Sequence, residues 1–152
     1  MNMVPMQPDR NDAAPRNPSD AAGKLRVVIV EDSAIIRSRL AEALTEIPNV
    51  EIVAQAESEP EALALMRGTQ WDVAVLDLQL KLGTGLGLLK SLTEGVRPPN
   101  TRIIVLTNYA FPQYRDRSLL LGADYFFDKA REFQRVHEVV RALASGDPSV
   151  SH

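Results

Sequence analysis

Apolar residues along this chain gather in short uninterrupted runs, separated by segments with helical spacing. In the runs 27–30 and 73–76 every residue is apolar, without the alternation of a strand that has one face in water. Such runs are typical of a parallel sheet that is covered on both faces. Between the runs, Ile36, Leu40 and Leu44 repeat at the period of a helix with one apolar face. We therefore expect an α/β fold in which five pairs of strand and helix build a doubly wound sheet.

Turn and capping residues set the boundaries of the expected elements. Strands are expected within 25–32, 50–56, 71–80, 101–107 and 122–130. Helices are expected at 33–46, at 58–67, at 84–94, within 112–121 and at 131–144. Ser58 is a suitable N-cap with Pro60 in the first turn, and Gly122 is a suitable residue just beyond a helix end. This order places one folded domain at 25–145.

The two ends of the chain lack a hydrophobic period. Residues 1–24 carry four prolines among polar residues and alanines, and residues 146–152 are short and largely polar. Such segments cannot bury enough apolar surface to offset the entropy of ordering. We expect a flexible tail at each end and no output domain after the last helix.

The composition fits one packed domain and argues against several classes of protein. Of the 152 residues 45% are hydrophobic, and the net charge of -3 comes without a Lys/Arg cluster, so we expect no direct nucleic-acid binding. The absence of cysteine excludes disulfides and thiolate sites. No signal-peptide pattern is present and no run approaches about 18 apolar residues, so we expect a cytoplasmic protein without a membrane span.

Three acidic residues follow two of the buried runs. Glu31 and Asp32 come after the first run and Asp77 after the third, where the carboxyl ends of parallel strands form a crevice. Any one of them could be an ordinary solvated loop residue. Together they would repel one another unless a cation joined them, and Mg²⁺ is a hard ion that prefers oxygen ligands. The pattern therefore predicts a magnesium site.

A hydroxyl and an amine at two further strand ends extend this site. Thr107 ends the fourth strand and could donate a hydrogen bond to a phosphoryl oxygen, while Lys129 follows the fifth strand and could supply a positive charge. Phosphoryl transfer requires little beyond an in-line nucleophile, a divalent ion and fixed donors. We expect Asp77 to be the nucleophile, forming an aspartyl phosphate.

These residues resemble the receiver domains of bacterial two-component response regulators over about 25–144. The resemblance rests on Glu31-Asp32, Asp77, Gly85, Thr107 and Lys129. It implies a flavodoxin-like, five-stranded parallel sheet with strand order 2-1-3-4-5 and helices on both faces. Because the chain ends soon after its last helix, we expect a stand-alone receiver.

The resemblance also implies roles for individual residues. Glu31, Asp32, Asp77 and the backbone carbonyl of Gln79 would hold Mg²⁺, and Asp77 would accept a phosphoryl group from a histidine kinase or phosphotransfer protein. Thr107 and Lys129 would sense that group, with Phe126 at the aromatic switch position. The protein would be a phosphoacceptor switch rather than an enzyme. It would act on an unknown protein partner, or form a phosphorylation-dependent dimer, through helix four, strand five and helix five.

The sequence departs from the family pattern at four positions. Lys81 and Ala130 stand where the family commonly has proline, Asn108 replaces a smaller residue, and Phe126 lacks the hydroxyl of the more frequent tyrosine. None of these changes removes an expected ligand. Because a non-proline cis bond costs about 3 kcal/mol, we expect the peptide between Lys129 and Ala130 to be trans.

Other functions remain open at this level. A dehalogenase-type phosphatase would need a second aspartate where Gln79 stands, and Glu31-Asp32 would repel the phosphate of a flavin in a flavodoxin-like flavin binder. Within the resembled family the alternatives are a phosphate sink, a phosphorelay intermediate and a scaffold that works without phosphorylation.

Overall fold

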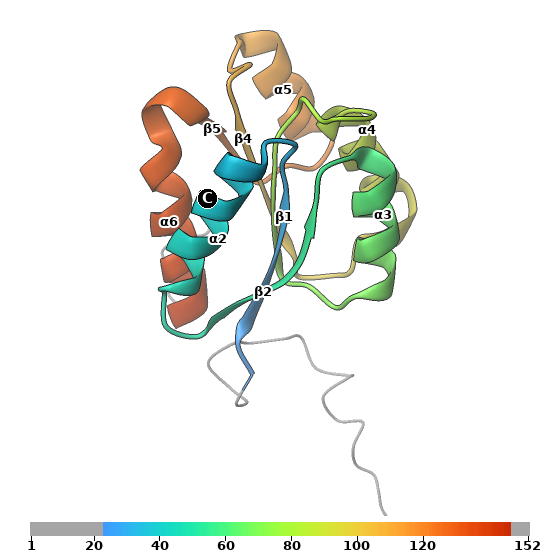
Figure 1. Ribbon diagram of the computed structural model, residues 1–152. Coiled ribbons are helices and arrows are strands. Elements are labelled where there is room, and N and C mark those ends of the chain that lie inside the picture. The colour runs from blue at the N-terminus through green and yellow to red at the C-terminus, as the bar shows by residue number, and fades with distance from the viewer. Residues whose placement is uncertain (1–22, 147–152) are drawn as a thin grey trace, which may run out of the picture.

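A computed structural model describes residues 23–146, so the tails expected at 1–24 and 146–152 lie almost wholly outside the described residues (Figure 1). A five-stranded parallel sheet forms the centre, with strand order β2-β1-β3-β4-β5. The strands are β1 (Leu25–Val30), β2 (Val50–Ala56), β3 (Val73–Leu76), β4 (Arg102–Thr107) and β5 (Tyr125–Asp128). The expected sheet and its order are confirmed.

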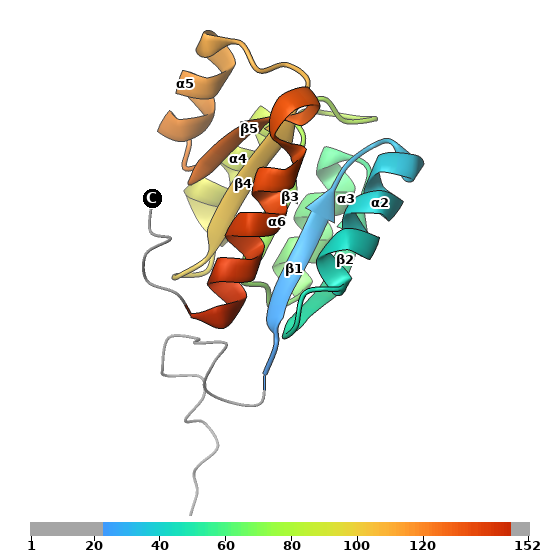
Figure 2. The same ribbon diagram turned by 90° about the vertical axis from the view of Figure 1, so that its left-hand side faces the viewer.

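Helices cover both faces of the sheet, as the continuous apolar runs require. The helices are α2 (Ala34–Thr45), α3 (Glu59–Gly68), α4 (Gly85–Ser91), the π-helical turn η2 (Leu92–Val96), α5 (Pro112–Leu120) and α6 (Lys129–Ser145). Helices α2 and α6 lie together on one face, and α3 and α4 lie on the other (Figures 1 and 2). Tyr114 of α5 packs on the same side as α3 and α4.

Alternate strand residues point into two separate cores. Val28, Val30 and Leu76 pack on the side of α3 and α4, whereas Val27, Ile29 and their neighbours pack on the side of α2 and α6. All five of these side chains are almost completely buried. Their burial explains why the strands carry no polar alternation, and it fixes the register that brings the strand ends together.

Some element boundaries differ from the sequence prediction. The helix expected at 84–94 stops at Ser91 and continues as the π-helical turn, and the helix expected to end before Gly68 includes it. The last helix begins at Lys129 instead of 131 because Asp128 caps it: its side chain accepts the N–H of Ala130 at 2.9 Å. Glu132 in turn accepts the N–H of Asp128 at 2.9 Å and has a non-helical φ of -122°.

The predicted helix caps and the predicted trans peptide bond are confirmed. Ser58 caps α3 by accepting the N–H of Glu61, and Gly122 follows α5 with a left-handed φ of +111°. The described residues contain no cis peptide, so the bond between Lys129 and Ala130 is trans. Within the described part of the chain no helix combines the length and apolarity needed to cross a membrane.

At the amino ends of the strands, two arginine–aspartate pairs tie neighbouring strands together. Arg26 of β1 makes a two-pronged bond with Asp72 just before β3, through Nε at 3.0 Å and Nη2 at 3.1 Å. Arg97 donates to Asp124 at 2.8 Å and to the carbonyls of Thr101 at 3.0 Å and Gly122 at 2.7 Å. Both aspartates also accept a backbone N–H of the adjacent strand.

Candidate functional site

The carboxyl ends of β1 and β3 bring the three predicted acidic residues together. Val30 pairs with Leu76 in the parallel register, so the residues that follow, Glu31 and Asp77, lie side by side. Each of Glu31, Asp32 and Asp77 offers a carboxylate oxygen, and these oxygens lie within 4.8 Å of one another. Glu31 and Asp77 are buried, whereas Asp32 is exposed. The site therefore has a buried base and an open side.

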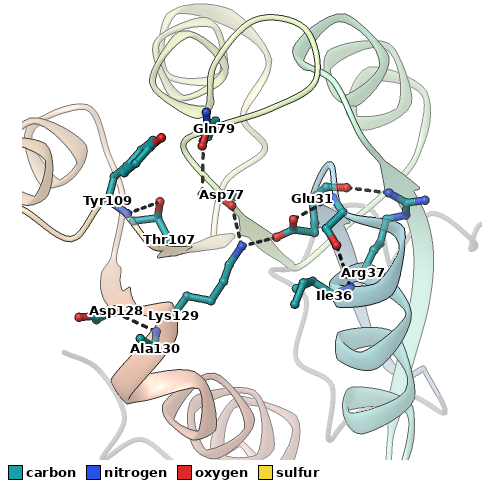
Figure 3. A network of polar contacts seen from close by, with 11 residues as sticks. Glu31, Ile36, Arg37, Asp77, Gln79, Thr107, Tyr109, Asp128, Lys129 and Ala130 are labelled. Atoms are coloured by element: carbon teal, nitrogen blue, oxygen red, sulfur yellow. Dashed lines mark hydrogen bonds and ion pairs between the residues drawn. The ribbon is translucent and has the colours of Figure 1, made fainter.

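The turn from β1 into α2 holds Glu31 in place. Ser33 caps α2 with its hydroxyl, and its own N–H donates to Oε2 of Glu31 at 3.0 Å. Arg37, one turn along the helix, donates from Nη1 to the backbone carbonyl of Glu31 at 2.7 Å (Figure 3). The acidic turn is thus fixed by its own helix.

Lys129 reaches the acidic cluster from the first turn of α6. Its ammonium lies 2.8 Å from Oε1 of Glu31 and 2.7 Å from Oδ2 of Asp77 (Figure 3). The side chain is only 10% exposed, so these ion pairs form in a poorly hydrated place. Asp77 also accepts the N–H of Gln79 on Oδ1 at 3.3 Å.

The electrostatics of the cluster shift two pKa values. Burial raises the pKa of Glu31 above its ordinary 4.5, against the opposing effect of the hydrogen bonds from Lys129 and the Ser33 N–H. Burial alone would lower the pKa of Lys129, but the hydrogen bonds to Asp77 and Glu31 outweigh it and raise the pKa. The lysine therefore stays charged at neutral pH and serves as the counter-ion of the buried carboxylates.

Thr107 ends β4 beside the acidic cluster, as the sequence predicts. Its side chain is fully buried, and Oγ1 accepts the N–H of Tyr109 at 3.1 Å (Figure 3). Phe126 pairs with Val105 across β4 and β5, and its ring is buried in the core on the side of α3 and α4. Thr107 lies two residues after Val105 on β4, so the backbone links its hydroxyl to the residue that pairs with Phe126.

The loop after Asp77 depends on a close approach of two backbones. Gly85 opens α4, and its N–H donates to the carbonyl of Leu78 at 2.8 Å. A Cβ at Gly85 would overlap the carbonyl oxygen of Asp77, so no other residue fits without moving the strand end. Gln79 and Thr84 face each other in an isolated antiparallel bridge that closes the loop.

The aromatic residues near α5 and β5 divide between core and surface. Phe127 is buried, and Tyr125 stacks on it with 6.0 Å between ring centroids. Phe111 is exposed at the start of α5. Tyr114 is half-buried and packs on the core. Surface aromatics therefore lie at the start of α5 more than along its length.

The donor set of the cluster suits a hard divalent cation. Three carboxylates face one ammonium group, so the cluster carries negative charge that Lys129 does not offset, and all of its free ligand atoms are oxygens. A cation bound there would neutralise the remaining charge beside Asp77. Sequence reasoning missed Arg37, which bonds the carbonyl of Glu31, and Glu59, whose carboxylate accepts the N–H of Thr84 in the loop after Asp77. The sequence signal for the position of Glu59 is the Gly-rich stretch LGTGLG at 82–87, because a Cβ at Gly83 or Gly87 would overlap the Glu59 side chain.

Comparison with known proteins assigns the sequence and the fold to one family. The sequence matches the response regulator receiver domain over residues 27–141. It is 30% identical over 122 residues to the DNA-binding transcriptional activator DevR/DosR of Mycobacterium tuberculosis. That match covers 80% of this chain and 55% of the activator, so the chain spans about half the length of this relative.

Solved structures agree with the sequence match. The signal receiver domain of the response regulator NarL from Mycobacterium tuberculosis superposes with a TM-score of 0.71 at 25% identity, covering 82% of this chain and 98% of that domain. A response regulator from Burkholderia pseudomallei, solved with a phosphorylated aspartic acid, a calcium ion and citrate, gives 0.68 at 25% identity, covering 84% and 69%. This chain belongs to the family of response regulator receiver domains.

Proposed function

We propose that this protein is a phosphorylation-activated signalling receiver whose phosphoacceptor is Asp77. The observation that carries the proposal is the meeting of three strand-end carboxylates with the Lys129 ammonium, 2.7 Å from Oδ2 of Asp77. Membership of the family supports it. The structure of the Burkholderia relative supports it further, since that protein holds a phosphorylated aspartate and a divalent ion.

The proposed reaction is a direct phosphoryl transfer to Asp77. A carboxylate oxygen of Asp77 attacks the phosphorus of a phosphohistidine on a kinase or phosphotransfer protein. The new P–O bond forms as the P–N bond breaks, and the bonding pair leaves with the imidazole nitrogen. The product is an acyl phosphate whose added negative charge lies next to Lys129.

A bound Mg²⁺ would supply charge neutralisation for the incoming phosphoryl oxygens. Glu31, Asp32, Asp77 and the backbone carbonyl of Gln79 are the oxygen donors proposed to hold it. Asp32 stands on the open side of the cluster, where a cation and a phosphoryl donor can enter. Asp77 is buried and held by two hydrogen bonds, which keeps the nucleophile oriented.

The signalling step is proposed to begin at Lys129 and Thr107. Phosphorylation changes the partner that Lys129 bonds and offers the buried Thr107 hydroxyl a new acceptor. A move of Thr107 alters β4, which pairs with β5 at Phe126. The face formed by α5, β5 and α6 would then change its affinity for a protein partner or for a second copy of the chain. The rival functions are a phosphate sink and a phosphorelay intermediate.

The phosphoacceptor is tested by labelling the chain with acetyl phosphate in the presence of Mg²⁺. We expect one acid-stable, base-labile phosphoryl group, and none in Asp77→Asn. Asp116→Asn is the matched control. Asp116 is exposed on α5, so this substitution removes the same charge at a position away from the cluster. Full labelling of Asp77→Asn would overturn the proposal.

The output face is tested separately in cells. Arg115 and Leu120 are exposed on α5, so Arg115→Ala and Leu120→Ser change the face with little effect on packing. A lost downstream response with unchanged phosphoryl turnover supports a partner that reads this face. An unchanged response across a panel of such variants favours the phosphate sink.

A further inference from the structure

The loop that follows the phosphoacceptor strand is tied to the start of helix α3. This loop, residues 79–84, carries the Gln79 carbonyl that is a proposed cation ligand. Two backbone bonds join it to the junction of β2 and α3. The N–H of Lys81 donates to the carbonyl of Glu57 at 3.0 Å, and the N–H of Glu59 donates to the carbonyl of Leu82 at 2.8 Å. Helix α3 therefore borders the site without contributing a ligand.

A side chain adds a third connection at the point where the loop enters α4. Oε1 of Glu59 accepts the N–H of Thr84 at 2.9 Å. Thr84 caps α4, because its hydroxyl accepts the N–H of Gly87 at 2.9 Å. The Glu59 carboxylate thus lies at a helix start, where unpaired N–H groups favour negative charge.

Two glycines leave room for this carboxylate. A Cβ on Gly83 would lie 2.5 Å from both Cβ and Oε1 of Glu59, and a Cβ on Gly87 would lie 2.6 Å from Oε1. Gly83 also has a φ of +78°, which favours glycine. A side chain at either position would displace the carboxylate. The stretch 83–87 therefore forms a slot that Glu59 fills.

We propose that Glu59 is a positioning residue for the cation and phosphoryl site, acting through the loop 79–84. Thr84, whose N–H Glu59 holds, faces Gln79 in the antiparallel bridge. Fixing Thr84 therefore fixes the residue opposite the proposed ligand carbonyl. A loop that is already ordered loses less conformational freedom when the cation binds, so affinity rises. The inference rests on the proposed function of Asp77.

The test is a Mg²⁺ titration of the full chain, in which the NMR chemical shift of the Gln79 backbone amide reports the affinity. Glu59→Ala should weaken binding about tenfold, the lower end of the range for residues that support metal ligands, because Glu59 acts on the ligand carbonyl only through Thr84. Glu59→Gln keeps an oxygen that can accept the Thr84 N–H and should recover most of the affinity. The matched control is Glu61→Ala. Glu61 lies in the same helical turn with the same charge, but its carboxylate accepts the N–H of Glu57 and bonds no amide of the loop 79–84.

Two further readouts separate positioning from general stability. Without Mg²⁺, amide exchange at 79–84 should speed up in Glu59→Ala and stay unchanged in Glu61→Ala. The rate of phosphorylation by acetyl phosphate should fall at low Mg²⁺ and approach the wild-type rate at saturating Mg²⁺. Gly87→Ala should weaken Mg²⁺ binding in the wild-type background and add nothing to Glu59→Ala, because both changes remove the same contact.

The outcomes distinguish this inference from the proposal on which it rests. If the wild-type chain binds no Mg²⁺ and takes no phosphoryl group, both fail. If the wild type does both and Glu59→Ala binds Mg²⁺ equally well with an unchanged loop, only the positioning role fails. An equal loss in Glu61→Ala would also overturn it, because the effect would then belong to helix α3 in general. Loss of folding in Glu59→Ala, read by thermal unfolding, leaves Glu59→Gln and Gly87→Ala to decide.

Discussion

The two ends of the parallel sheet treat charge in opposite ways. At the amino ends each aspartate has its own arginine, Asp72 with Arg26 and Asp124 with Arg97, and each accepts a backbone N–H of the neighbouring strand as well. At the carboxyl ends three carboxylates lie together, and the ammonium of Lys129 bonds two of them, Glu31 and Asp77. At the amino ends the negative charge of each aspartate is paired with an arginine. At the carboxyl ends negative charge remains that a bound cation could neutralise.

This difference separates stability from function within one small domain. A carboxylate that has a dedicated arginine and a backbone N–H is satisfied within the fold, so it has little to offer a ligand. A crowded set of carboxylates costs stability in the absence of a cation and gains from binding one. Changes at the amino ends should therefore alter the free energy of unfolding, and changes at the carboxyl ends should alter cation binding and phosphorylation.

The largest effect is expected from breaking an amino-end pair. Arg97→Met should lower the free energy of unfolding by about 2–3 kcal/mol, because Asp124 and two backbone carbonyls lose their donor. Mg²⁺ affinity should stay within twofold of the wild type. Urea unfolding and a Mg²⁺ titration measure the two quantities, with the exposed Arg141→Met as control. A marked loss of Mg²⁺ affinity would contradict the separation.

The next effect is expected from Lys129→Met without Mg²⁺. The variant leaves Glu31 and Asp77 buried without their counter-ion and should lose about 1.5 kcal/mol of stability. Added Mg²⁺ should reduce the difference in unfolding free energy between the variant and the wild type, since the cation replaces the missing positive charge. Urea unfolding at several Mg²⁺ concentrations follows this. A gap that stays constant would mean that Lys129 acts by packing.

A smaller effect, confined to binding, is expected from Asp32→Asn. Loss of one charged oxygen from the open side should weaken Mg²⁺ binding about tenfold, which is about 1.4 kcal/mol. The free energy of unfolding without Mg²⁺ should not fall, because Asp32 is exposed and its charge adds to the crowding. Calorimetric titration and urea unfolding measure both, with Asp116→Asn as the exposed control. Equal Mg²⁺ affinities in the two variants would remove Asp32 from the proposed site.

The smallest effect is a pH dependence that comes from Glu31. Because the pKa of Glu31 is raised in the folded state, the native protein holds this proton at pH values where the unfolded chain has lost it. The resulting stability is present below about 4.5 and is lost as the pH rises through the raised pKa. The slope of stability against pH over this window should flatten in Glu31→Gln. An unchanged slope in Mg²⁺-free urea unfolding would contradict the assignment.

The sequence predicted residue positions best where a polar residue directly ends a buried apolar strand. Asp77 and Thr107 lie where the apolar runs predict, because the buried register leaves few choices. The start of α6 was wrong by two residues, since Asp128 and Glu132 cap it at a spacing one longer than an ordinary capping box. Glu59 was missed because an acidic residue at a helix start is common, and its partner is 25 residues away.

The pairing of Lys129 with Glu31 also affects when the chain can become active. The two residues are 98 positions apart, so their contact closes one of the longest loops in the molecule. Until β5 joins the sheet and α6 follows, the acidic cluster lacks its counter-ion, which is also the residue proposed to contact the phosphoryl group. We therefore expect competence for phosphorylation to arise only when folding is finished. Newly made or partly unfolded copies would then not be phosphorylated, and only completely folded molecules would contribute to the signal.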